Sequence, residues 1–373
     1  MIDGSRMQSL LERIAPEQVP GIWVAVGRHG RMLWEGAAGW SDIQQRHPAA
    51  PGLALGIGSI TKTWIAVLVL QLAEEGRLCL HDSIAQHLPA QCLDGIANAA
   101  RASIADLLDH HSGIFSWEDA PDWIRRGRGI DIAPGRPWSA DEPLQYVRGR
   151  AAAAPVGEAF HYSNSNFTLL GLLIEQVSGR SLVEVLQQRI LQPLELTATC
   201  LEGFGPSVHQ LRAKRYHWRT AEYLASAGLC PQFPVIDSDR IDVSSSDLSV
   251  EWAAGGLVCP THELLRFMMA LADGRLLSAA GMQAMQRWRA AGERGETGRG
   301  LFRMTTPEGN VLGHDGNVLG SSASAWWFEQ AACTVAIQVN IGSMHAGPAA
   351  CSAGRLFRSR GIARLALQMC SAG

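Results

Sequence analysis

The spacing of apolar residues predicts strands at both ends of the chain. Ile22, Val24 and Val26 alternate with other residues, and a turn at 28–31 separates them from a second run, so 21–40 is expected to form a hairpin. Short β-type runs return near the other end, at 300–306, 310–315, 322–328 and 334–340. We therefore expect an α+β fold, in which one antiparallel sheet combines N-terminal and C-terminal segments and is flanked by helices.

Helical patterns dominate between these two strand regions. Helices are predicted over 9–15, 61–75, 104–108, 166–178, 182–190, 263–272 and 354–369. The helix at 61–75 is apolar on nearly every face, which predicts that it lies in the centre of a domain. We expect two domains: residues 1–78 and 251–373 form an α/β domain that holds the sheet, and residues 79–250 form an inserted, mainly helical domain.

Two long stretches, 115–143 and 203–250, interrupt the helical region and are rich in Gly, Pro, Ser, Asp and Trp. Loops of this length inside a compact domain are usually functional, so these are expected to line a cleft. Trp117 and Trp123 would either line a pocket there or anchor the loop as buried rings. The run Arg125-Arg126-Gly127-Arg128 is predicted to be a solvated turn.

Composition and charge narrow the class of protein. The chain has 373 residues, of which 47% are hydrophobic and 18% charged, as in globular proteins with a sizeable core. Its net charge of -3 makes nucleic acid an unexpected partner. The longest strongly apolar run, 64–72, is too short to cross a bilayer, and 1–30 has no signal-peptide pattern. The sequence predicts a cytoplasmic protein without membrane contact, whose scattered cysteines are buried thiols, and leaves the oligomeric state open.

The first candidate chemistry is Ser59 and Lys62, an S-x-x-K pair at the start of the buried helix. A spacing of three residues puts both side chains on one helix face. Burial and the positive end of the helix dipole both favour the neutral amine of Lys62, which is one of only two lysines in the chain. A neutral amine beside a hydroxyl is a base beside a nucleophile. The alternative is an N-cap serine and a lysine that reaches the surface.

The second candidate is the triplet Tyr162-Ser163-Asn164, in a polar turn directly before an apolar helix. If nearby cationic groups lower the pKa of Tyr162, the phenol can take the serine proton and later activate water. The alternative is a capping turn, in which Ser163 or Asn164 satisfies N–H groups of the helix.

The third candidate is His314-Asp315-Gly316, on a predicted strand. Alternation puts His314 and Gly316 on one face, where a glycine lets a ligand lie close to the strand backbone. The N–H groups of Asn317 and Ser59 would then form an oxyanion hole. Alone, this pattern carries little weight.

Together the three motifs resemble the serine β-lactamase and penicillin-binding-protein superfamily, in particular its class C-like branch. That branch includes D,D-carboxypeptidases, D-amino-acid amidases and aminopeptidases, family VIII esterases and some acyltransferases. The resemblance covers essentially the whole chain. Its further signature-like segments are Gly58-Ser59-Ile60-Thr61-Lys62-Thr63, Leu107-Leu108-Asp109-His110-His111-Ser112-Gly113-Ile114 and Ala254-Gly255-Gly256-Leu257.

The resemblance implies a β-lactamase/transpeptidase-like fold and a role for each motif residue. Ser59 would be the acyl-accepting nucleophile, and Lys62 and Tyr162 the coupled proton-transfer pair. Asn164 would bind the substrate amide or Lys62. His314 stands where β-lactamases of this branch carry the lysine of K-T-G, and with Gly316 and Asn317 it would line the substrate site.

Asp315 departs from the family pattern, which usually has Thr or Ser there as a donor to a substrate carboxylate. An ionised aspartate facing the cleft would repel such a carboxylate by about 4 kcal/mol at 4 Å and an effective dielectric of 20. We therefore expect a neutral ester or amide, or a substrate with an ammonium group, in preference to penicillins. This expectation depends on Asp315 pointing into the cleft.

The sequence thus predicts a serine hydrolase that acts through an acyl-enzyme on a small-molecule ester, amide or peptide. The mechanism requires no metal and no organic cofactor. His262-Glu263 lacks the second histidine of H-E-x-x-H, and the adjacent His110 and His111 are expected to form structural hydrogen bonds rather than a metal site. Two alternatives use the same residues: an acyltransferase or offloading enzyme of natural-product biosynthesis, and a catalytically silent ligand-binding homologue.

Overall fold

The computed structural model describes residues 4–205, 212–359 and 361–372. Within them a nine-stranded antiparallel sheet has the strand order β3-β2-β1-β14-β13-β12-β11-β10-β9. The strands of this sheet are β1 (Gly21–Arg28), β2 (Arg31–Asp42), β3 (His47–Pro48), β9 (Arg289–Ala290), β10 (Glu296–Thr297), β11 (Phe302–Thr306), β12 (Gly309–Val318), β13 (Ser321–Phe328) and β14 (Cys333–Val339).

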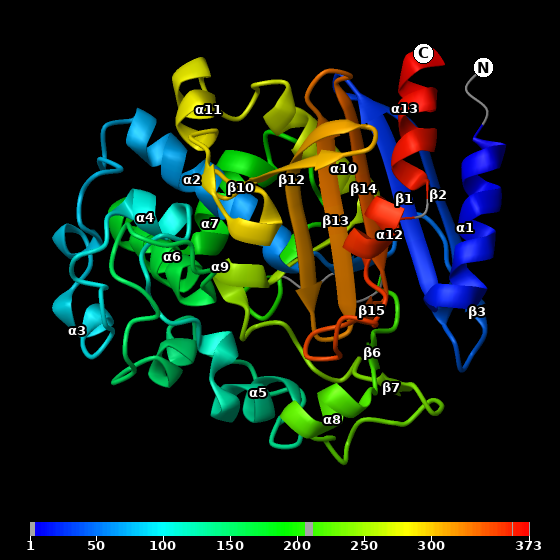
Figure 1. Cartoon of the computed structure of the whole chain (residues 1–373), viewed down its shortest axis with the longest axis horizontal. Coiled ribbons are helices and arrows are strands. Elements are labelled where there is room, and N and C mark those ends of the chain that lie inside the picture. The colour runs from blue at the N-terminus through cyan, green and yellow to red at the C-terminus, as the bar shows by residue number, and fades with distance from the viewer. Residues whose placement is uncertain (1–3, 206–211, 360, 373) are drawn as a thin grey trace.

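Strands from the N-terminal and C-terminal parts of the chain pair with each other inside the sheet. β1 pairs with β14 from Ile22 opposite Val339 to Arg28 opposite Cys333. Figure 1 shows these blue and orange strands side by side, with both termini at the same end of the sheet. This pairing confirms the predicted α+β fold with a sheet made from N-terminal and C-terminal segments.

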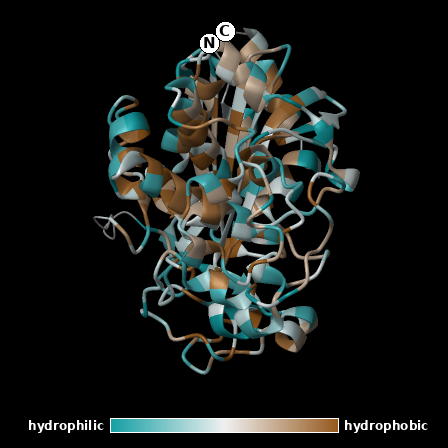
Figure 2. Cartoon of the chain, turned by 90° about the vertical axis from the view of Figure 1, so that its left-hand side faces the viewer, coloured by the Kyte–Doolittle hydropathy of each residue, from teal (hydrophilic) through white to brown (hydrophobic). Residues whose placement is uncertain are grey.

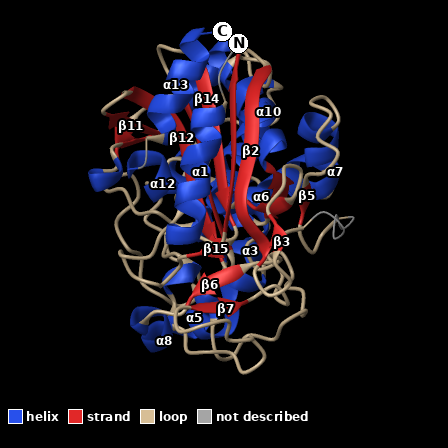
Figure 3. Cartoon of the chain, turned by 90° about the vertical axis from the view of Figure 1, so that its right-hand side faces the viewer, coloured by secondary structure: helices blue, strands red, loops and turns tan. Residues whose placement is uncertain are grey.

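Helices cover both faces of this sheet, because its strands bury side chains on both sides. Val24 belongs to a core cluster with α1, α12 and α13, whereas its neighbour Ala25 belongs to the larger cluster that includes α2, α6 and α10. Figure 3 shows α1, α12 and α13 in front of the sheet and α10 behind it. Figure 2 shows the brown apolar stretches gathered inside the molecule.

The α-helices mostly follow the predicted segments. They are α1 (Ser5–Gln18), α2 (Thr61–Glu74), α3 (Ala90–Leu93), α4 (Ile104–Leu108), α5 (Pro121–Arg128), α6 (Asn164–Ser178), α7 (Leu182–Leu186), α8 (Ala221–Ser226), α9 (Trp252–Gly255), α10 (Thr261–Ala272), α11 (Ala279–Met285), α12 (Ala353–Ser359) and α13 (Ile362–Ala372). The single helix predicted over 354–369 is wrong, since two helices occupy that region.

Shorter helical turns complete the chain between these elements. They are η1 (Gly58–Ile60), η2 (Ile84–Gln86), η3 (Trp117–Asp119), η4 (Glu142–Tyr146), the π-helical turn η5 (Gln187–Leu191) and η7 (Gly292–Arg294). η1 leads directly into α2, whose side chains are buried from Thr61 to Leu70, as its apolar pattern predicts. This buried helix carries the first candidate motif.

Two small sheets join the middle of the chain to the rest. One has the order β4-β8-β5, from β4 (Ala54–Gly56), β8 (Leu257–Pro260) and β5 (Cys200–Leu201). The other has the order β15-β6-β7, from β15 (Ile341–Gly342), β6 (Tyr216–Trp218) and β7 (Arg240–Asp242). The division at residues 78 and 250 stays a prediction.

The two stretches predicted as long loops contain more regular structure than expected. The first holds η3 and α5, so Arg125 to Arg128 are helical and the predicted solvated turn is wrong. Trp117 and Trp123 are fully buried with ring centroids 4.6 Å apart, and they anchor this segment. The second stretch holds β6, α8 and β7, and its residues 206–211 lie outside the described part. Among the described residues, no helix combines the length and apolar character that a membrane crossing requires.

Candidate active site

Ser59 lies in η1, between β4 and the buried helix α2, and its side chain is partly exposed. The preceding Gly58 has φ +55°, in the left-handed region that favours glycine. A Cβ at Gly58 would lie 2.5 Å from the backbone nitrogen of Asn317. A residue without a side chain is therefore needed for this turn to lie against β12.

Lys62 is the residue that the first turn of α2 brings to Ser59. Its Nζ lies 2.9 Å from Ser59 Oγ and donates to the carbonyl oxygen of Ala254 over 2.7 Å. The side chain is fully buried, and burial lowers the pKa of Lys62 to about 7, against opposing effects from Glu118 and Glu251. A substantial fraction of Lys62 is therefore neutral near pH 7, beside the hydroxyl that has to lose a proton.

Tyr162 lies two residues before the start of α6, and its side chain reaches Lys62 and Ser59. Its ring stacks on His110 with centroids 4.3 Å apart, and Lys62 Nζ lies 4.9 Å from the ring centroid. The guanidinium of Arg294 lies 4.7 Å from that centroid. Burial raises the pKa of Tyr162 above its usual range, although contact with Ser59 and the charge of Arg294 act in the opposite direction.

The expectation that cations lower the pKa of Tyr162 is therefore wrong, because burial outweighs them. Its buried hydroxyl oxygen also lacks a well-formed hydrogen bond to any described residue. In the resting site Tyr162 is therefore a neutral phenol close to Ser59. Lys62, rather than Tyr162, is the group that gives up its proton more easily.

Asn164 begins α6 and lies beside a carboxylate that the sequence did not indicate. Its Nδ2 donates to Glu118 of η3, and its backbone N–H donates to Ser116 Oγ over 3.0 Å. Its Oδ1 is buried without a hydrogen-bond partner in the described part of the chain. This oxygen is available to a hydrogen-bond donor, and the role in substrate binding that the resemblance implies for Asn164 stays a prediction.

β12 presents His314 and Gly316 towards η1. A Cβ at Gly316 would lie 1.8 Å from the carbonyl oxygen of Ile57 and 3.0 Å from Ser59 N. A Cβ at Gly58 would in turn lie 2.5 Å from Asn317 N. The backbone amides of Ser59 and Asn317 therefore lie next to each other. This arrangement is suited to an oxyanion hole.

His314 is buried and neutral. Its Nδ1 donates to the carbonyl oxygen of Asp315, and burial lowers the pKa of His314 to about 3, with the charge of Lys62 acting in the same direction. Its ring lies edge-on to Phe302, with centroids 5.0 Å apart. At neutral pH His314 therefore offers a neutral imidazole, and not the positive charge of the lysine at this position in β-lactamases.

Asp315 points to the opposite side of the sheet. Ser324 Oγ and Trp326 Nε1 donate to its Oδ1 over 2.6 and 3.0 Å, and Arg358 of α12 pairs with its Oδ2 at 2.6 Å. The expectation that Asp315 lines the substrate site is wrong in this structure, because strand alternation turns it towards α12 while His314 and Gly316 face Ser59. The predicted repulsion of substrate carboxylates by Asp315 loses its basis.

Three charged residues of the site were missed by sequence reasoning. Glu118, Glu251 and Arg294 all act on the pKa of Lys62, yet they come from η3, the residue before α9, and η7. None stands at a fixed spacing from a motif residue. Arg294 is exposed and forms no ion pair with a described residue, so its charge is directed at Tyr162.

His110 and His111 form structural hydrogen bonds, as predicted. His110 Nδ1 accepts from the backbone N–H of Ser163 over 3.1 Å, and His111 Nδ1 donates to the carbonyl oxygen of Asp109 over 2.9 Å. Burial lowers the pKa of His110 well below its usual value. A neutral His110 therefore holds the ring of Tyr162 in place.

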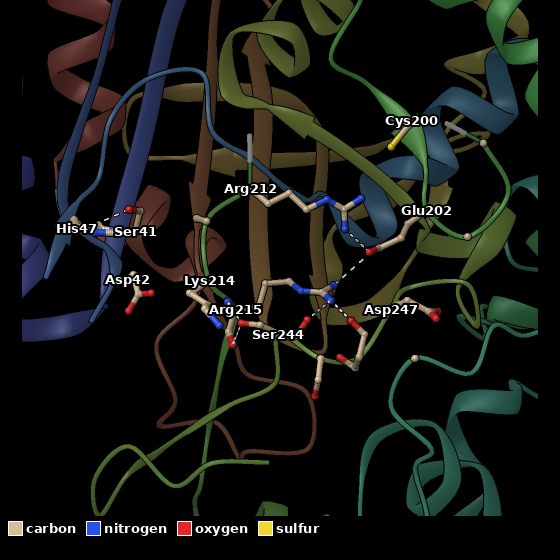
Figure 4. Close-up of a pocket in the computed structure, with 16 residues that line it drawn as sticks. Ser41, Asp42, His47, Cys200, Glu202, Arg212, Lys214, Arg215, Ser244 and Asp247 are labelled. Carbon is tan, nitrogen blue, oxygen red and sulfur yellow. Dashed lines mark hydrogen bonds and ion pairs between the residues drawn. The ribbon is translucent and has the colours of Figure 1, made fainter. Parts of the chain in front are cut away.

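A separate polar cavity of about 650 Å³ lies away from these residues (Figure 4). Its cationic side chains are neutralised locally: Arg212 and Arg215 both pair with Glu202, and Lys214 lies 3.5 Å from Asp242. Ser59, Lys62 and Tyr162 are not among the described residues that line it.

Ser59, Lys62 and Tyr162 thus lie together on an α+β scaffold. The family model described as Beta-lactamase matches residues 8–353, and the chain belongs to this family. The family assignment confirms the resemblance that the motifs indicated.

The individual proteins to which this chain is similar include amidases and a peptidase. A D-stereospecific amidohydrolase from Streptomyces is 28% identical, with a TM-score of 0.77 and coverage of 91% of this chain and 95% of that one. The D-amino acid amidase from Ochrobactrum anthropi SV3 shares the fold, with a TM-score of 0.82, 21% identity and coverage of 99% and 98%.

Among curated proteins, a D-aminopeptidase of Brucella anthropi is 27% identical over 246 residues, which is 57% of this chain and 40% of that protein. Protein flp of Staphylococcus aureus is 28% identical over 183 residues, which is 48% of this chain and 34% of that protein. The chain thus spans well under two thirds of the length of these curated relatives.

Proposed function

We propose that the protein is a serine hydrolase that cleaves a small-molecule ester or amide through an acyl-enzyme on Ser59. The observation that carries this proposal is the distance of 2.9 Å between Ser59 Oγ and Lys62 Nζ, combined with a Lys62 pKa of about 7. A nucleophile and a base that is partly neutral at physiological pH are the minimum for this reaction.

In the first half-reaction, neutral Lys62 takes the proton of Ser59 while Oγ attacks the substrate carbonyl carbon. The tetrahedral oxyanion accepts hydrogen bonds from the backbone N–H groups of Ser59 and Asn317. Tyr162 donates its phenolic proton to the leaving nitrogen or oxygen and regains one from Lys62. The carbon–leaving group bond breaks, and the acyl group remains on Ser59.

In the second half-reaction, water attacks the acyl carbon. One proton of this water passes through Tyr162 to Lys62. The two residues act as one relay, because Lys62 lies against both Tyr162 and Ser59. The oxyanion is held by the same two N–H groups, and the ester bond to Ser59 breaks. Ser59 recovers its proton and the acid product leaves.

For the substrate we favour an amide of an amino acid with a free ammonium group. Glu118 is a partly buried carboxylate that contacts Asn164, and it acts on Lys62 as a negative charge. A substrate ammonium beside Glu118 would find both a counter-charge and the free Oδ1 of Asn164. The similarity to the Streptomyces amidohydrolase supports the same choice.

The test is active-site labelling followed by a substrate panel. Wild type and Ser59→Ala are treated with a fluorophosphonate, and the masses of the intact proteins are measured by mass spectrometry. Wild type is expected to gain one adduct and the variant none. Hydrolysis of D-phenylalanine amide, L-phenylalanine amide, a p-nitrophenyl ester and a chromogenic cephalosporin is then compared. Equal labelling of both proteins would remove Ser59 from its role, and turnover of the cephalosporin alone would overturn the proposed substrate class.

A further inference from the structure

A buried ion pair lies behind the catalytic turn. Arg128, the last residue of α5, pairs through Nη2 with Oε1 of Glu251, the residue before α9. Their side chains are only 1% and 3% exposed. The guanidinium also lies 5.0 Å from the ring of Trp123, and its Nε and Nη1 have no hydrogen-bond partner in the described part of the chain.

Glu251 is connected to Lys62 by two hydrogen bonds through the turn at 251–254. The carbonyl oxygen of Glu251 accepts from the N–H of Ala254 over 2.7 Å, and the carbonyl oxygen of Ala254 accepts from Lys62 Nζ. The Glu251 carboxylate folds back inside this turn, where its Oε2 lies 3.2 Å from the Cβ position of Gly255. The same Cβ position is 3.6 Å from the carbonyl carbon of Gly58, which is bonded to the nitrogen of Ser59.

A buried ion pair of this kind is weak evidence for a stabilising role. Removing two charges from water costs about as much free energy as their attraction returns, and apolar replacements of similar volume are often as stable. Arg128 makes the cost larger, because two of its nitrogen atoms are buried without partners. Its position beside the residue that anchors Lys62 indicates a functional role.

We infer that Arg128 and Glu251 are positioning residues for proton transfer: together they fix the turn that holds Lys62 and set how readily its amine releases a proton. This inference rests on the proposed role of Lys62 as the base. Ionised Glu251 favours the charged form of Lys62. Burial raises the pKa of Glu251 and Arg128 acts in the opposite direction, so Arg128 helps to keep this carboxylate ionised. The pair thus holds a negative charge close to the base.

The charges that face Lys62 define the expected signs. Glu118 of η3 and Glu251 favour its ammonium form, and Arg294 of η7 opposes it. His110 and His314, which also face it, are neutral because burial lowers the pKa of both, and Tyr162 is neutral because burial raises its pKa. Loss of the Glu251 charge should therefore make Lys62 easier to deprotonate. Loss of Arg128 should act in the same direction, because Glu251 then takes up a proton more readily.

The experiment measures the rate of fluorophosphonate labelling of Ser59 from pH 5 to 9 in four full-length proteins. These are wild type, Glu251→Gln, Arg128→Met and the double variant. The acidic limb of the profile should move down by about one pH unit in Glu251→Gln, and in the same direction in Arg128→Met. In the double variant it should coincide with that of Glu251→Gln, because without the carboxylate Arg128 has no group to keep ionised.

A matched control is Arg125→Met on the same helix, since Arg125 pairs with Asp131 at an exposed site, where the two side chains are 50% and 52% exposed. Its profile should superimpose on that of wild type. Thermal unfolding of every variant identifies any that fails to fold. If Arg128→Met fails to fold, the near-isosteric Glu251→Gln and the double variant still test the inference. Shifts of opposite sign in the two single variants, or none, would overturn the inference while leaving the proposed hydrolase intact. An unlabelled wild type would instead refute the hydrolase.

Discussion

Lys62 and Ala254 are joined by a hydrogen bond of 2.7 Å from Nζ to the carbonyl oxygen, although 192 residues separate them in the chain. The bond holds the amine against Ser59 at the buried start of α2. The side chain of Lys62 is thereby fixed in a buried setting that costs stability and lowers the pKa of its amine.

This setting predicts the pH dependence of the reaction. A buried amine with a pKa of about 7 is protonated below that value and neutral above it, so kcat/KM for a p-nitrophenyl ester should rise with pH through a midpoint near 7. Lys62→Met should lower kcat/KM by about 10² to 10⁴ and raise or preserve the thermal unfolding midpoint, because the charged form is no longer buried. A rate that is flat from pH 5 to 8 would contradict this assignment.

Tyr162→Phe tests the proton donor. The ring stack with His110 survives the change and only the hydroxyl is lost. We expect a fall of about 10² to 10⁴ in kcat/KM for an amide, and a smaller fall for a p-nitrophenyl ester, whose leaving group needs no proton. Equal losses on both substrates, measured in parallel by steady-state kinetics, would argue against leaving-group protonation by Tyr162.

Glu118→Gln tests the ammonium site. Removal of the negative charge should raise KM for an amino-acid amide about tenfold, equivalent to about 1.4 kcal/mol, and leave KM for a neutral ester unchanged. Asp119→Asn is the matched control, because Asp119 is the adjacent, exposed carboxylate. If Glu118→Gln changes both substrates alike, or if Asp119→Asn has the same effect, Glu118 is not the counter-charge.

Gly316→Ala tests the close approach of β12 to the nucleophile turn. The added Cβ would lie 1.8 Å from the carbonyl oxygen of Ile57, so the strand and η1 have to separate. The two oxyanion donors would move apart, and kcat should fall by at least about 10² to 10³. Circular dichroism checks that the sheet is retained. An active Gly316→Ala protein would show that Ser59 and Asn317 do not act together.

Asp315→Asn separates structure from catalysis. Because the carboxylate contacts Ser324, Trp326 and Arg358 on the far side of the sheet, we expect activity and substrate preference to stay within about twofold. The free energy of unfolding should fall by about 1 to 3 kcal/mol, since hydrogen bonds to a charged acceptor are weakened. A selective gain in cephalosporin hydrolysis would instead place Asp315 in the substrate site.

Local patterns in the sequence were enough to predict those parts of the candidate site whose geometry depends on residues close together in the chain. The three-residue spacing of Ser59 and Lys62 places them on one helix face whatever the rest of the chain does. The apolar run of α2 required burial, and burial lowers the pKa of the amine. Alternation along β12 put His314 and Gly316 together and Asp315 opposite them.

Only the tertiary structure decided which face of β12 meets Ser59, and so whether Asp315 or His314 faces a substrate. It also decided that burial of Tyr162 outweighs the charge of Arg294. Glu118 and Glu251 enter the site from segments far from Lys62 in sequence, where no spacing rule applies. Local geometry follows from covalent connectivity, whereas the electrostatic setting of a buried group depends on every element packed around it.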